Sequence, residues 1–194
     1  MQSLDPTEFQ TRRDKIDVAL DGSGWDIGDS SQVALEVDTK KSDFKTGNYK
    51  SHGDTRKMIG IEVHAYADYI LRDGSGAPLS VIEAKRTSKS ATLGQKQAEG
   101  YAADVQRQTG NEVFIYFTNG IQTWFWNKPY ENPRPVTGFH SREDLERMRF
   151  QNHHRTDVTS LQIEARIVDR LYQIKAVKAV LEDLSHTSQG SSYL

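Results

Sequence analysis

Three ionisable residues lie in or beside short apolar runs, where such side chains are least expected. Asp68 lies within the run His64–Leu71, and Glu83 lies within the run Leu79–Ala84, two residues before Lys85. A carboxylate in an apolar strand is costly unless a cation or a hydrogen-bond donor compensates it. The three residues are therefore the first candidates for a site that binds a cation and does chemistry.

The segment between the two runs, RDGSGAP, is dense in Gly, Asp and Pro, which predicts a β-hairpin. If the hairpin turns about Ser75 and Gly76, Asp68 lies opposite Glu83, and Lys85 points from the same face as Glu83. Directly opposed side chains have Cβ atoms about 4.5–5.5 Å apart, so two carboxylates there would repel each other. A divalent cation between them would remove that repulsion.

The ligand types favour Mg²⁺, with Mn²⁺ as a substitute. Asp68 and Glu83, the backbone carbonyl of Ala84 and several waters would form the oxygen shell that Mg²⁺ prefers. Lys85 beside the ion could orient or deprotonate a water and offset charge on a phosphate, which is the chemistry of metal-assisted phosphodiester hydrolysis. The chain has no cysteine, so thiolate zinc sites and disulfides are excluded.

The residues alone leave a second explanation open, which is a plain ion-pair network across the hairpin. Glu-x-Lys arises by chance about once in a chain of this size, because both residues are common. Acid-x-Lys also occurs at Asp38-Thr39-Lys40 and Asp43-Phe44-Lys45, in a polar stretch that we interpret as a surface loop.

The elements that would position the site form an alternating pattern. Periodicity and capping predict helices over residues 7–20, 91–108 and 162–184, and a short helix that begins at Ser141 with a capping box to Asp144. Strands are predicted over residues 32–37, 64–71, 79–84, 112–118 and 121–126, with a two-residue turn at Asn119-Gly120. This order predicts an α/β fold with a mixed central β-sheet flanked by helices.

Composition limits the number of domains, the charge and the location that the chain can have. The chain has 194 residues, of which 36% are hydrophobic and 27% charged, with a net charge of −2. That size suits one domain with a core, and the near-neutral charge means that any DNA contact needs a local basic patch. The N-terminus lacks the apolar segment of a signal peptide, and no apolar run is long enough to span a membrane, so a cytoplasmic location is expected.

The predicted helix that follows the second strand adds Gln97 and Tyr101, which are four residues apart and so share one face. Such a pair can reach back toward a metal site or a DNA phosphate. The spacing alone is more often that of a tyrosine packed in the core beside a solvated glutamine.

Taken together, these residues resemble the PD-(D/E)xK nucleases, and specifically the N-terminal domain of type I restriction enzyme R subunits (HsdR). The matching segments occur in order along most of the chain: RRDKIDVAL…GW from Arg12, ADYIL from Ala67, VIEAKRT from Val81, GQKQAEGYA from Gly94, TNG…FW from Thr118 and FHSREDL from Phe139. Ala67 stands where the name of the nuclease group implies proline, which is usual in this subgroup.

This resemblance implies a restriction-endonuclease-like core over residues 1–155, which cuts DNA. It implies that Asp68 and Glu83 bind the metal, that Lys85 is catalytic, and that Gln97 and Tyr101 form an accessory motif. It also implies partnership with methyltransferase (M) and specificity (S) subunits.

Residues 156–194 are expected to be a helical linker that leads toward an ATPase motor. The segment LYQIKAV from Leu171 resembles the stretch just ahead of that motor, where Gln173 would match a glutamine that reads adenine. The chain contains no Gly-x-x-x-x-Gly-Lys-Ser/Thr phosphate loop, so ATP would act only through a motor domain that this chain lacks.

Further residues are candidates for DNA contacts, metal binding or packing. Arg86 and Lys89 adjoin the site and are the best candidates for DNA contacts. Glu8 on the first helix is a weaker candidate for a further carboxylate. His153-His154 is interpreted as a surface pair, and Trp124 and Trp126 as packing residues.

Two rival functions remain open. One is a module of the same fold that docks DNA or partners without turnover, and metal binding without cleavage would favour it. The other is a repair or recombination nuclease of the same fold.

Overall fold

The computed structural model describes residues 7–50, 66–155, 170 and 172–180. The chain divides into two compact units, residues 1–148 and 149–194. The predicted boundary at residues 155 and 156 stays a prediction, because most of the predicted linker lies outside the described residues. Of the helix predicted over residues 162–184, residues 172–180 are helical. None of the described helices is long and apolar enough to cross a membrane.

The first unit is built on one six-stranded sheet in which each strand pairs with its neighbour in sequence. Only the pairing between β3 and β4 is parallel, so the sheet is mixed, as the sequence predicts. The strands are β1 Val33–Asp38, β2 Tyr66–Arg72, β3 Pro78–Ala84, β4 Phe114–Thr118, β5 Thr123–Trp126 and β6 Arg134–Val136.

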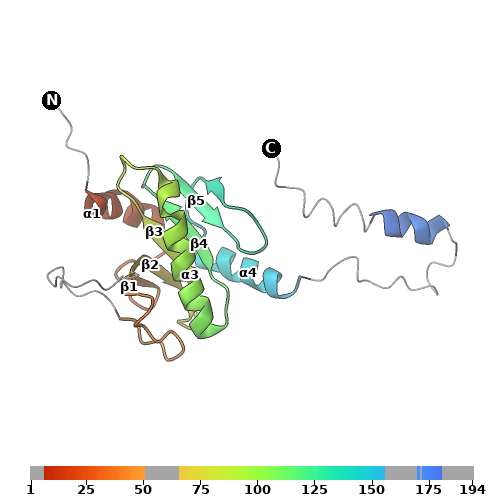
Figure 1. Cartoon of the computed structure of the whole chain (residues 1–194), viewed down its shortest axis with the longest axis horizontal. Coiled ribbons are helices and arrows are strands. Elements are labelled where there is room, and N and C mark those ends of the chain that lie inside the picture. Colours follow the sequence, from red (N-terminus) through yellow and green to blue (C-terminus); the bar gives the residue numbers. More distant parts are fainter. Residues whose placement is uncertain (1–6, 51–65, 156–169, 171, 181–194) are drawn as a thin grey trace. The chain divides into compact units, whose positions relative to one another are not determined.

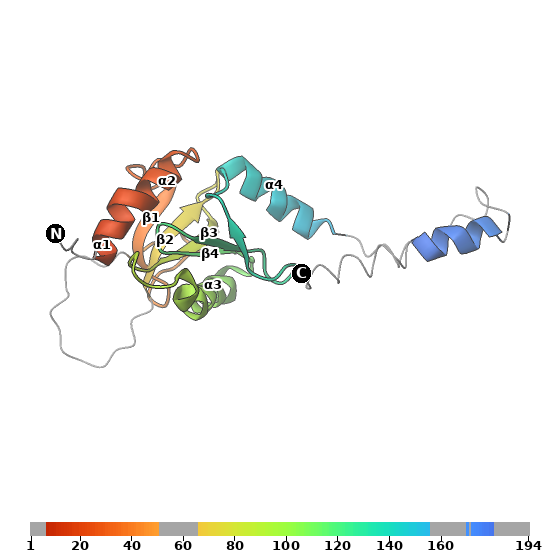
Figure 2. The ribbon, with the colours of Figure 1, turned by 90° about the horizontal axis from the view of Figure 1, so that it is seen from above.

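Helices cover both faces of this sheet. The first helix is continuous but changes type, from α1 Glu8–Thr11 through a π-helical turn η1 Arg12–Ile16 to α2 Asp17–Asp21. On the other face a 3₁₀ turn, η2 Ala91–Gly94, leads into α3 Gln95–Thr109. Helix α4 Arg142–His153 lies on the face of the first helix, where Leu145 joins the same core as Ile16 and Leu20. Figure 1 traces this order, and Figure 2 shows α1 and α2 on one side of the sheet and α3 on the other.

Local sequence signals explain where the helices begin and end. Thr7 caps α1, because its side chain accepts from the Gln10 N–H while the Gln10 side chain accepts from the Thr7 N–H. Gly110 ends α3 with a φ of 76°, a left-handed conformation that glycine adopts without strain. Ser141 accepts from the Asp144 N–H at 3.2 Å, which confirms the predicted cap of α4.

Two apolar cores lie on the two faces of the sheet. One joins the first helix to the sheet through residues such as Ile16, Leu20 and Trp25. The other packs α3 on the sheet through Ala98, Val105 and their neighbours. Both β3 and β4 are buried along their whole length, so these central strands have their side chains in both cores.

The β2–β3 hairpin has the register that the sequence predicts. Tyr69 pairs with Ile82, Ile70 with Val81 and Leu71 with Ser80, and the register shifts only between Leu71 and Arg72. Continued by one residue, this register places Asp68 beside Glu83 at the end of the hairpin away from its turn. The bulge lies near the turn, so it leaves the predicted geometry of the acids intact.

Three details differ from the sequence-based expectations. The connection from β4 to β5 takes four residues, because the Asn119 side chain accepts from the N–H groups of Ile121 and Gln122 and widens the turn. Asp38 is buried at 4% exposure rather than on the surface, and it accepts from the Lys40 and Lys41 N–H groups. Strand β6 is not among the strands that the sequence predicts.

Candidate active site

Asp68 lies in β2 and is held by donors on both carboxylate oxygens. The Ala84 N–H of the adjacent strand donates to Oδ2 at 2.7 Å, and the Arg12 guanidinium donates to Oδ1 at 2.8 Å. The side chain is 13% exposed. This buried carboxylate is therefore fixed in orientation by one bond from the sheet and one from the first helix.

Glu83 lies in β3 and is buried, with a relative exposure of 3%. Lys85 follows two residues later on the same face, and its ammonium donates to both the Glu83 carboxylate and the Gln97 side-chain oxygen. Gln97 belongs to α3, so Lys85 joins the central sheet to the helix that covers it. The packing is tight here, because a Cβ added to Gly94 would lie 2.9 Å from the Glu83 Cγ.

Burial is the main cause that raises the pKa of both carboxyl groups. Burial, followed by the charge of Asp68, raises the pKa of Glu83 from its ordinary 4.5 to about 8, although Lys85 opposes the shift. Burial raises the pKa of Asp68 as well, against the Ala84 hydrogen bond and the Arg12 charge. The charged form of each carboxylate is therefore disfavoured, and the titration belongs to the pair.

Tyr101 lies one turn after Gln97 on α3 and is buried at 7% exposure. Its hydroxyl shares a hydrogen bond with Gln97, and burial followed by the charges of Glu83 and Asp68 raises its pKa. Gln97 and Tyr101 thus face the acid pair. The structure brings together the predicted metal ligands, the predicted catalytic lysine and both residues of the predicted accessory motif.

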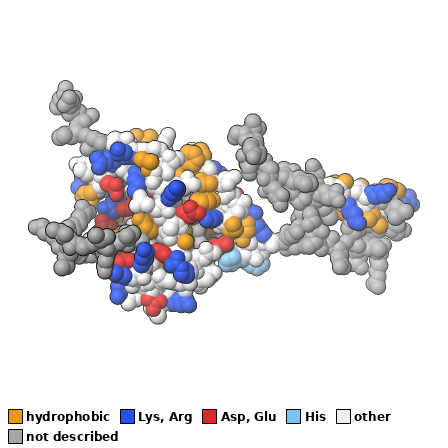
Figure 3. Space-filling model, in the orientation of Figure 1, with side chains coloured by type: hydrophobic (Ala, Val, Ile, Leu, Met, Phe, Trp, Pro, Cys, Tyr) orange, Lys and Arg blue, Asp and Glu red, His pale blue; other side chains and the backbone are white. Residues whose placement is uncertain are grey.

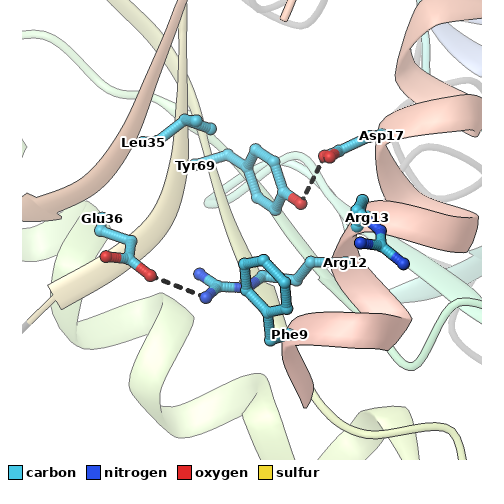
Figure 4. A pocket seen from close by; sticks show the side chains of 7 residues that line it. All are labelled: Phe9, Arg12, Arg13, Asp17, Leu35, Glu36 and Tyr69. Atoms are coloured by element: carbon cyan, nitrogen blue, oxygen red, sulfur yellow. Dashed lines mark hydrogen bonds and ion pairs between the residues drawn. The ribbon is translucent and has the colours of Figure 1, made fainter. Parts of the chain in front are cut away.

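Sequence reasoning missed two residues that hold Asp68 in place. Arg12 bridges Asp68 and Glu36, with its other terminal nitrogen 2.7 Å from the Glu36 carboxylate (Figure 4). Glu36 lies in β1 between the residues that pair with Tyr69 and Ala67, and it has a φ of +49°. A non-glycine residue in this region is strained, and such strain often marks a functional site. The RRDK stretch of the first helix was the available signal, because it carries Arg12 among several charged residues.

The loop after β3 carries the predicted DNA-contact residues. Arg86 and Lys89 are both exposed, and the loop is fixed because Asn119 donates to the Lys89 carbonyl at 2.7 Å and Thr11 accepts from the Thr87 N–H. On the face seen in Figure 3, basic side chains are interspersed with acidic ones.

Glu8 of α1 lies near enough to the acid pair for its charge to raise the pKa of Asp68 and of Glu83, whereas His154 and Trp124 fall outside the site. His154 is exposed and contacts the Phe150 carbonyl within α4's last turns, which agrees with a surface role. Trp124 stacks on Phe117 at 5.9 Å between ring centroids, as expected of a packing residue. In the described part of the chain, no group of three or more His, Cys, Asp or Glu side chains is arranged to hold a metal ion.

The donor set nevertheless fits a hard divalent cation. Asp68 and Glu83 provide carboxylate oxygens at one place, and burial disfavours their charged forms, which a bound cation would stabilise. Mg²⁺ commonly binds through one or two carboxylates and keeps several waters, so a third acidic ligand is not needed.

The mixed sheet with helices on both faces, and two acids and a lysine on its central strands, defines an α/β restriction-endonuclease-like fold. A fragment structure described as that of an HsdR subunit of a type I restriction enzyme from Vibrio vulnificus YJ016 matches it with a TM-score of 0.57 and 21% sequence identity. The match covers 97% of this chain and 34% of that chain, so this chain spans about a third of the matched structure.

A family model described as "Type I restriction enzyme R protein N terminus" matches residues 61–134, which include both strands of the acid pair and α3. The family match and the shared fold confirm the resemblance to the N-terminal domain of HsdR subunits. No curated protein sequence matches the chain.

Proposed function

We propose that the chain is a Mg²⁺-dependent DNA endonuclease domain of a type I restriction R subunit, and that it hydrolyses phosphodiester bonds. The observation that carries this proposal is the convergence of Asp68 and Glu83 with Lys85, which links Glu83 to Gln97 on α3. A strongly raised pKa, about 8 for Glu83, is common among the ionisable groups of functional sites and supports the same proposal.

Asp68, Glu83 and the backbone carbonyl of Ala84 would hold the metal, and Mn²⁺ would substitute for Mg²⁺. When bound, the ion supplies Lewis-acid polarisation of the scissile phosphate and lowers the pKa of a coordinated water. With the ion present, both carboxylates would be ionised, because its charge would offset the effect of burial that raises their pKa values.

The protein's own side chains have distinct tasks in this proposal. Lys85 holds a positive charge between Glu83 and Gln97, where its ammonium can donate to a phosphate oxygen as negative charge develops. Gln97 and Tyr101 orient Lys85 and limit the access of water from the α3 side. Arg12 and the Ala84 N–H fix Asp68, so that the carboxylate need not reorganise during the reaction.

The wider assignment follows from the family. Arg86 and Lys89 would grip the DNA backbone beside the site, and sequence specificity would come from the M and S subunits of the complex. ATP would act only through a motor domain outside this chain, and the site of action would be the cytoplasm.

The test is nicking of supercoiled plasmid DNA by excess protein in Mg²⁺ or Mn²⁺. Lys85→Met should lower the nicking rate at least about 100-fold, the scale typical of a charged group that stabilises the transition state. The control is Lys45→Met, which removes the lysine of the exposed acid-x-Lys motif in the loop after β1. Equal rates for the two variants would contradict the assignment. Metal binding without any nicking would favour the rival, a docking module without turnover.

A further inference from the structure

A cavity of about 390 Å³ lies between the first helix and the β1–β2 edge of the sheet (Figure 4). Its volume falls within the roughly 300–1,000 Å³ typical of small-molecule sites. The Phe9 and Leu35 side chains form apolar walls and are 57% and 41% exposed. Tyr69 contributes a buried ring, so the cavity offers flat and apolar surfaces to a ligand.

Polar groups line the same cavity. The Asp17 carboxylate accepts from the Tyr69 hydroxyl at 2.7 Å, and the Glu36 carboxylate accepts from Arg12 at 2.7 Å. Each carboxylate has further lone pairs that can accept from a ligand amino group. The Arg13 guanidinium lies 6.0 Å from the centre of the Phe9 ring, where it can also meet a ligand.

The cavity adjoins the proposed metal site through one side chain. Arg12 lines the cavity and contacts Asp68 at 2.8 Å with its other terminal nitrogen. A group seated against Arg12 is therefore separated from the acid pair by a single guanidinium. On a bound DNA strand, this is a place for a nucleotide next to the scissile phosphate.

We propose that this cavity binds an unpaired nucleobase of the DNA strand, next to the phosphate that is cut. The inference rests on the proposed nuclease function and extends it. The base stacks on Phe9, as bases do on aromatic residues of single-strand binding sites, and its amino group donates to Asp17 or Glu36. The base is unpaired because a base within a duplex has both faces stacked and its pairing edge occupied.

This assignment predicts a base preference. Adenine, cytosine and guanine carry an exocyclic amino group that can donate to a carboxylate, whereas thymine carries none. Single-stranded oligo(dA) should therefore bind more tightly than oligo(dT) of equal length.

The test is fluorescence anisotropy of labelled oligo(dA) with the whole chain, in EDTA so that no cleavage occurs. Phe9→Ala should weaken binding about tenfold, within the range measured for loss of one stacking partner. Phe150→Ala is the matched control, because Phe150 is 62% exposed and lies outside the cavity lining. Both phenylalanines are largely exposed, so both variants should fold, and equal melting temperatures would verify that.

A second oligonucleotide, which lacks bases, tests whether Phe9 contacts a base. An abasic strand of the same length keeps the phosphates but lacks bases, so Phe9→Ala should have no effect on its binding. The cavity assignment is overturned if Phe9→Ala binds oligo(dA) as Phe150→Ala does, or if the abasic strand shows the same loss. Metal binding that depends on Asp68 would still support the proposed function in that case. A wild type that binds neither metal nor DNA would overturn both.

Discussion

Glu83→Gln should make the metal-free protein more stable at alkaline pH while it removes metal binding. The reason is that Glu83 is buried beside Asp68, which raises its pKa from 4.5 to about 8. Between these two values the unfolded chain has released the proton while the folded chain retains it. The folded state then binds more protons, so the free energy of unfolding falls as the pH rises through this interval. Glutamine cannot ionise, so Glu83→Gln removes this pH-dependent loss of stability.

The magnitude follows from the size of the shift. Each pH unit within the interval costs about 1.4 kcal/mol of stability. Between about pH 5.5 and about pH 8 the loss reaches about 3 kcal/mol at most, because Asp68 shares the titration and half of the groups are ionised at the upper end. That is a large fraction of the roughly 5–15 kcal/mol that stabilises a typical domain.

The assay is denaturant unfolding in EDTA at several pH values, on the wild type and on Glu83→Gln. The difference in unfolding free energy between the two should shift in favour of Glu83→Gln as the pH rises. Glu99→Gln, which makes the same change at a carboxylate of α3 that pairs with Lys128, should follow the wild-type profile because Glu83 is intact. If the wild type and Glu83→Gln lose stability in parallel, the burial argument is refuted.

Three further predictions concern the residues that hold the acid pair in place and the protons that the pair carries. Gly94→Ala should reduce metal affinity at least about tenfold, because the new Cβ lies 2.9 Å from the Glu83 Cγ and forces the carboxylate to move, and titration calorimetry measures this. The control Gly100→Ala meets nothing within 4 Å and should stabilise α3 by about 0.5–1 kcal/mol, so equal metal affinities in the two variants would contradict the packing argument. Arg12→Gln should cost about 3–5 kcal/mol of metal-free stability near neutral pH, because it leaves Asp68 without its charged partner. A loss of stability near zero in thermal unfolding would argue against a stabilising Arg12–Asp68 ion pair. Metal should release protons on binding below about pH 8, so calorimetric heats should depend on the ionisation enthalpy of the buffer, and buffer-independent heats would argue against a protonated pair.

The sequence was sufficient to predict the position of the acid pair, because that position depends on the local pattern of apolar and turn residues. The apolar runs around Asp68 and Glu83 and the Gly-rich segment between them set a hairpin register that the structure confirms. The Gln97–Tyr101 face was predictable in the same way, since helical spacing places both on the side of α3 that meets the sheet.

The ion pairs of Arg12 with Asp68 and Glu36 were not predictable, because they depend on tertiary packing. Arg12 reaches Asp68 only because the first helix packs across the sheet, and nothing in the RRDK stretch distinguishes it from the exposed Arg13. Glu36 has a left-handed conformation within β1 that alternation cannot indicate. The widened β4–β5 turn arises likewise from Asn119 side-chain bonds that compete with the two-residue turn.

The most direct test of the central claim is a calorimetric titration of Mg²⁺ and Mn²⁺ into the wild type, Asp68→Ala and Asp43→Ala. Asp43 belongs to the exposed acid-x-Lys motif after β1 and is the matched control. We predict binding to the wild type and to Asp43→Ala, and none to Asp68→Ala. Equal binding to all three proteins, or none to the wild type, would contradict a metal centre at this hairpin.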